Sequence, residues 1–134
     1  MKIQLKLEEL AQFLIAFHFI FFSYSPWWVY LLLILGPDIG MIGYLINTRI
    51  GAFTYNIFHH KGLAIVIAFV GHYFLHNDAI TLTGVILFGH ASMDRMFGYG
   101  LKYSTGFQHT HLGLIGNKTT GTDAQLRSHP SELR

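Results

Sequence analysis

The chain contains no cysteine, and only 12% of its 134 residues are charged. Without thiols it can form no disulfide, no thiol nucleophile and no thiolate metal site, so any metal must be held by imidazole and carboxylate groups. An ordinary soluble domain has roughly 25% charged residues. The low charge, together with 51% hydrophobic residues, argues against a water-soluble globule.

Basic residues are too few and too scattered to form a nucleic-acid-binding surface. The formal net charge is +2, and the lysines and arginines form no stripe that could neutralise a phosphate backbone. We therefore expect no nucleic-acid partner. A nucleotide site is also unsupported, because Gly98-Tyr99-Gly100 lacks the preceding strand and the third glycine of a phosphate-binding loop.

Long apolar runs dominate what is present. The 26 residues from Leu10 to Leu35 include no Asp, Glu, Lys or Arg, whereas a membrane-spanning helix needs only about 20 apolar residues. The polar cluster 23–26 divides this run into the end of one span and the start of the next. A signal peptide has a basic N-terminal region, whereas this chain has Glu8 and Glu9 there, so we expect no signal-peptide cleavage.

The pattern predicts an all-α polytopic membrane protein, a four-span up-and-down helical bundle with its second helix kinked at Pro37. Residues 1–116 are expected to form the transmembrane domain, and residues 117–134 a polar, disordered tail. Four spans enclose a small pore at best, so transport would require a homo-oligomer. The predicted spans are residues 7–22, 27–47, 52–75 and 79–97.

The positions of the basic residues predict the orientation. Five of them fall on one side of the predicted bundle, while the two opposite turns carry none. The positive-inside rule then places both termini in the cytoplasm, with the lipid bilayer as the main partner. These residues are Lys2, Lys6, Arg49, Arg95 and Lys102.

Ionisable side chains within the spans are the candidate functional residues, because each costs about 2.5–3.5 kcal/mol on insertion. Four of them reach the inner half of the bilayer within about two helical turns of one another. His90 and Asp94 share one helix face at i, i+4 spacing. His111 could fold back under the bundle and add an imidazole. The predicted metal ligands are Asp38, His59, His90, Asp94 and His111, a set that suits zinc, manganese or iron.

Structural interpretations of the same residues remain open at this stage. Asp38 follows a helix break and could cap the half-helix that begins there. Asp94 could pair with Arg49 or Lys102 at the cytoplasmic edge. Lys61 could extend its side chain to the lipid headgroups from a surface patch.

A family resemblance rests on the run Gly89-His90-Ala91-Ser92-Met93-Asp94-Arg95 and on Gly98-Tyr99-Gly100-Leu101-Lys102-Tyr103. The chain resembles, over residues 5–115, a bacterial family of small integral-membrane proteins known only as a domain of unknown function. The resemblance implies a location in the bacterial cytoplasmic (inner) membrane. Carried over by position, the family pattern falls on Asp38, His59, His90, Asp94, Arg95 and His111.

Two functions follow as hypotheses. In the first, a divalent metal lowers the pKa of a bound water toward about 7 for hydrolysis of a lipid-like ester or phosphoester. Asp38 and Arg95 are then the candidate catalytic residues, with Arg95 or Lys102 holding the anionic group. A His-x-x-x-Asp spacing on a late helix is similar to that of membrane-bound metal-dependent hydrolases. In the second, the cluster is a structural hydrogen-bond network, or a proton or cation path, in a protein without enzymatic activity.

Overall fold

The computed structural model describes residues 1–115, and these are mostly helical, as predicted. The only strands in this part are two residues long, β1 (His109–Thr110) and β2 (Gly113–Leu114), which pair antiparallel. The predicted tail, residues 117–134, lies outside the described residues. The helices are α1 (Lys2–Phe22), α2 (Trp27–Leu35), the 3₁₀-helix η1 (Gly36–Leu45), α3 (Thr48–Phe58), α4 (Lys61–Phe69), the π-helix η2 (Val70–Phe74) and α5 (Asp78–Phe97).

The second and third predicted spans are each interrupted. The expected kink at Pro37 takes the form of a change from α-helix to 3₁₀-helix at Gly36. The third span breaks at His59, where α3 ends and the chain turns by 46° into α4. Among the described residues, the segment Trp27–Leu45 is long and apolar enough to cross a membrane, and the bent pair of α3 with α4 and η2 qualifies if counted as one span. The four-span arrangement therefore remains a prediction.

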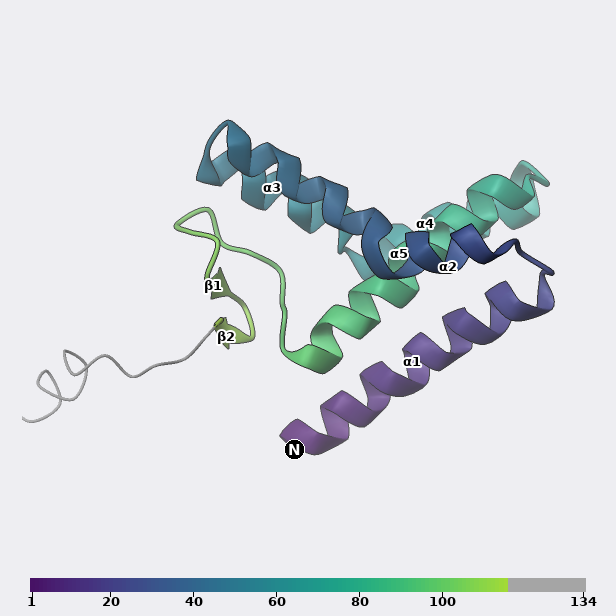
Figure 1. Ribbon diagram of the computed structural model, residues 1–134, viewed down its shortest axis with the longest axis horizontal. Helices are drawn as coiled ribbons and strands as arrows, with labels where there is room; N and C mark the ends of the chain where they lie inside the picture. Colours follow the sequence, from purple (N-terminus) through teal and green to yellow (C-terminus); the bar gives the residue numbers. More distant parts are fainter. Residues whose placement is uncertain (116–134) are drawn as a thin grey trace, which may run out of the picture.

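Helix α5 is the centre of the molecule (Figure 1). It packs against α1 along its length, against α4 and η2, and against α2 where the two helices cross. Helix α3 instead packs mainly on η1, and this pair projects from the rest. Side chains of α1, α2 and α5 form a small buried core of Ile20, Val29, Leu33 and Ile86.

Gly84 allows α4 and α5 to approach closely. A Cβ atom at this position would lie 2.6 Å from the backbone oxygen of Ala64 and 2.7 Å from the Cα atom of Ala68. We expect Gly84→Ala to lower the free energy of unfolding by about 1–3 kcal/mol, because the helices must separate. Gly36→Ala is the matched control, since its Cβ would meet only Leu32 at an ordinary 3.5 Å. Equal thermal unfolding of the two variants in detergent would contradict this account.

Candidate metal centre

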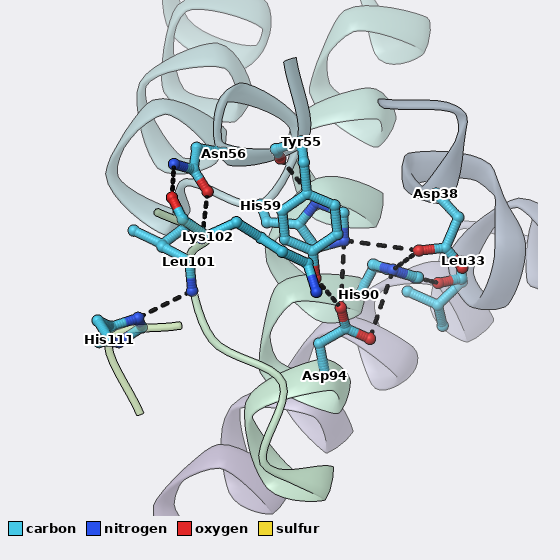
Figure 2. A network of polar contacts seen from close by, with 10 residues as sticks. All are labelled: Leu33, Asp38, Tyr55, Asn56, His59, His90, Asp94, Leu101, Lys102 and His111. Atoms are coloured by element: carbon cyan, nitrogen blue, oxygen red, sulfur yellow. Dashed lines mark hydrogen bonds and ion pairs between the residues drawn. The ribbon is translucent and has the colours of Figure 1, made fainter. Parts of the chain in front are cut away.

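Two histidines and two aspartates from three helical segments meet in one place (Figure 2). Asp38 comes from η1, His59 follows the last residue of α3, and His90 and Asp94 lie one turn apart on α5. His59 Nε2 lies 3.7 Å from Asp38 Oδ1 and 3.2 Å from Asp94 Oδ2. His90 Nε2 lies 3.4 Å from Asp38 Oδ1 and 3.6 Å from Asp94 Oδ1. One ligand atom from each residue thus lies within 4.8 Å of every other.

Pro37 explains how His90 is oriented. In a continuous α-helix, the backbone carbonyl of Leu33 would accept a hydrogen bond from the N–H of residue 37, but proline has no N–H. That carbonyl instead accepts a 3.0 Å hydrogen bond from Nδ1 of His90, 57 residues further along the chain. The imidazole is fully buried. The break between α2 and η1 therefore fixes the ring of His90.

The end of α3 orients His59 in a similar way. Its Nδ1 donates to the backbone carbonyl of Tyr55 at 2.9 Å, and its ring stacks on the Tyr55 ring with centroids 3.8 Å apart. His60 then begins the next helix, because its Nδ1 accepts the N–H of Leu63 at 3.0 Å. The break between α3 and α4 thus leaves His59 facing α5.

The two carboxylates differ in their surroundings. Asp94 is 14% exposed, and its Oδ2 accepts a 2.8 Å hydrogen bond from the hydroxyl of Tyr55. Asp38 is 38% exposed and makes no hydrogen bond among residues 1–115. The group of four residues is therefore shielded from solvent at the two histidines and accessible to solvent at Asp38.

The hydrogen bonds determine the tautomer of both histidines. A carbonyl oxygen can only accept, so Nδ1 of His59 and of His90 must carry the proton. In the neutral imidazole, each Nε2 then presents a lone pair to the carboxylate oxygens. Both Nε2 atoms are buried and make no hydrogen bond within the described chain. Lone pairs that face anionic oxygens repel each other unless a cation, or a second proton on each ring, lies between them.

The distances suit a metal ion at the centre. Tetrahedral zinc with bonds of about 2.0–2.1 Å has ligand atoms separated by about 3.3–3.4 Å. The four separations between nitrogen and oxygen are 3.2–3.7 Å, with the two histidines facing different oxygens of Asp94, and one ligand atom from each residue lies within 4.8 Å of every other. A metal-bound histidine also usually donates its other N–H to a carbonyl or carboxylate, as both rings do here. The residues could therefore hold a divalent ion.

Four of the five predicted ligands are brought together, and His111 is not among them. Its Nδ1 accepts the N–H of Leu101 at 2.8 Å, and its side chain is exposed. Arg95, proposed as a catalytic residue, follows Asp94 on α5, and its side chain makes no hydrogen bond or ion pair within residues 1–115. The structure therefore places His111 apart from the group and gives the Arg95 side chain no partner in the described chain.

The structural interpretations do not describe the contacts observed. Asp38 makes no capping hydrogen bond at the start of η1. Asp94 contacts histidines and a tyrosine instead of Arg49 or Lys102. Lys61 pairs with Glu9 of α1 and donates to Gln12 at 2.7 Å, so its ammonium joins α4 to α1.

Sequence reasoning missed Tyr55 beside this group, although it lies four residues before His59 and could have been found by that helical spacing. Lys102 was named only as a possible anion-binding residue, and its place beside Tyr55 could not be predicted, because it depends on a loop. Asn56 of α3 accepts the Lys102 N–H at 2.6 Å and donates to its carbonyl at 2.8 Å. Burial lowers the pKa of Lys102, while the carboxylates of Asp94 and Asp38 act in the opposite direction.

Comparison with known proteins identifies the family. A family model described as "Domain of unknown function (DUF4260)" matches residues 2–115, nearly the same range as the resemblance found in the sequence. No curated protein and no solved structure matches the chain. The match covers all four residues of the candidate metal centre. The chain belongs to the DUF4260 family, a domain of unknown function.

Proposed function

We propose that the chain is an integral protein of the bacterial inner membrane, with four spans and a cytoplasmic N-terminus. Many large apolar side chains are exposed on the helices, including Ile15, Phe22, Leu35 and Phe53. Such a surface is rare on soluble monomers but suits contact with lipid. Figure 1 supports an up-and-down order: the N-terminus and the end of α5 lie at one end of the molecule, and the turns at 23–26 and 75–77 lie at the other.

The four clustered residues hold one divalent metal ion in this proposal, zinc, manganese or iron. A single observation carries it: two buried imidazoles, each fixed by a backbone carbonyl, present bare Nε2 atoms to two carboxylates. A divalent cation converts this repulsive arrangement into four attractive contacts. Imidazole and carboxylate ligands together suit these three metals, and no thiolate is needed.

The reaction that this site supports best is metal-assisted hydrolysis of a lipid-like ester or phosphoester. The opening beside Asp38 would admit water and substrate, and zinc can expand from four to five ligands during a reaction. A metal-activated water would be the nucleophile. Asp38 is placed to accept its proton, and Arg95, which has no carboxylate partner in the described chain, could bind an anionic group.

Elemental analysis of the detergent-purified protein tests the metal site. We expect about one zinc, manganese or iron per chain in the parent, and none in a His90→Ala/Asp94→Ala variant. The double variant removes one neutral and one anionic ligand, so the remaining pair cannot hold the ion. Metal-loaded parent should then hydrolyse short-chain phospholipids or esters, and the variant should not.

Absence of metal from the parent, even after incubation with each ion, would contradict the proposal. The same residues would then form the alternative, a hydrogen-bond network or proton path with protonated imidazoles. In that case the double variant should lose thermal stability, because Tyr55 would lose its carboxylate acceptor.

A further inference from the structure

Lys102 lies beside the candidate metal centre, and its ammonium makes no direct contact with a carboxylate among residues 1–115. The residue is only 4% exposed, yet its ammonium makes no ion pair or hydrogen bond within residues 1–115. Its Nζ faces aromatic rings instead, 4.8 Å from the ring centre of Tyr55 and 3.7 Å from that of Phe107. Tyr55 is the same residue that stacks on His59 and donates to Asp94. The ammonium of Lys102 therefore lies beside Tyr55 at the edge of the candidate metal centre, as Figure 2 shows.

The position of Lys102 is fixed by its backbone. Two hydrogen bonds join its N–H and carbonyl to the side-chain amide of Asn56 on α3. A bridge to Thr110 holds it from the other side. These bonds fix the point from which the side chain extends. The ammonium has no anionic partner within residues 1–115, so its three donors are available to a ligand.

The hydroxyl of Tyr44 is a second hydrogen-bond donor beside the ring of Phe107, which the ammonium of Lys102 also contacts. Its hydroxyl is buried and makes no hydrogen bond in the described part of the chain. Its ring meets Phe107 edge to face, with centroids 5.4 Å apart. It also covers Gly51, which lies one helical turn before Tyr55 on α3. Phe107 thus contacts both the tyrosine that carries the free hydroxyl and the free ammonium of Lys102.

The net charge of the centre with its metal favours an anionic ligand. Two carboxylates neutralise a divalent ion, so Lys102 leaves the loaded centre with one net positive charge. Of the two free donors, one is a point charge of the kind that binds phosphate and the other a neutral hydroxyl. A tetrahedral phosphate group offers separate oxygens to each donor and to the metal, which a flat carboxylate does less well.

We propose that Lys102 and Tyr44 form an anion subsite that binds the phosphate group of the ligand beside the metal centre. This inference rests on the proposed function and narrows its substrate class from esters in general to phosphoesters. Of the two candidates for anion binding in the sequence, Arg95 and Lys102, it selects Lys102. The phosphate could belong to a lipid headgroup or to a soluble compound, because the donors recognise the same oxygens in both.

Equilibrium dialysis with radiolabelled inorganic phosphate tests the subsite on the full-length protein in detergent. We expect one phosphate per chain in the parent, and affinity lower by about tenfold or more in Lys102→Met, because a charge-assisted contact is lost. Tyr44→Phe removes one hydroxyl and should weaken binding by about tenfold. Its melting temperature should not fall, since the hydroxyl has no hydrogen-bond partner among residues 1–115 to lose. Lys6→Met, which makes the same charge change at an exposed position, should bind phosphate as the parent does.

Manganese measured in the same samples separates this inference from the metal site. Phosphate binding that depends on Lys102 in a parent without metal would support the subsite and contradict the metal proposal. A metal-loaded parent that binds no phosphate, or variants that bind it as the parent does, would overturn the subsite. Competition by short-chain phosphatidylglycerol identifies the source. If the lipid displaces the label at a lower concentration than unlabelled phosphate does, the natural ligand is a lipid headgroup. If it does so only at a higher concentration, the natural ligand is a soluble phosphate. Either result supports the subsite.

Discussion

Zinc or manganese added to the metal-free protein is expected to raise the free energy of unfolding by about 4 kcal/mol at a thousand times the dissociation constant. The gain is large because the ion binds only where folding has assembled Asp38, His59, His90 and Asp94, which are separated by up to 56 residues in the chain. A chelator should reverse the effect. Thermal unfolding in detergent, followed by circular dichroism over a range of metal concentrations, measures it.

A pair of histidine variants makes this test specific. His90→Gln removes a fully buried imidazole of the centre and should abolish the shift in melting temperature. His18→Gln removes an exposed imidazole of α1 that lies against the ring of Phe22, and should keep the shift. An equal shift in both variants would mean that the metal binds elsewhere, and the assignment of the centre would fail.

Pro37→Ala is expected to lower the metal affinity by about 10–100-fold without removing any ligand. Alanine restores a backbone N–H at residue 37, which can continue α2 by bonding to the carbonyl of Leu33. That N–H competes with Nδ1 of His90 for the same oxygen. The imidazole then loses the contact that sets its tautomer and orientation. Isothermal titration with manganese would measure the loss.

Pro26→Ala is the matched control for this substitution. Pro26 lies immediately before α2, and its replacement also restores a backbone N–H. Pro26 is not part of the candidate metal centre. Its metal affinity should equal that of the parent. If Pro37→Ala also kept the parent affinity, the carbonyl of Leu33 would have no part in positioning His90, although the metal site itself could still exist.

Much of the fold follows from local pattern. The long apolar runs and the polar clusters between them predict helices at 7–22 and 79–97, close to α1 and α5 as observed. The sequence also indicates which polar side chains lie at a similar depth in the predicted helical bundle, because the rise per residue along a helix is constant. It does not show that the third predicted span breaks at His59, since the polar run His59-His60-Lys61 could equally lie within a continuous helix.

The sequence by itself determined the helical class, the absence of thiolate chemistry and the four residues that belong to one group, because each depends on composition or helical spacing. Tertiary structure decided the rest. It excluded His111, whose position depends on the path of the loop after α5, and it placed Lys102 against Tyr55 through the side chain of Asn56. It also determined that the Leu33 carbonyl, which Pro37 leaves without a helical partner, accepts a hydrogen bond from His90. Contacts between distant segments depend on how helices cross and loops return, and no local pattern specifies either.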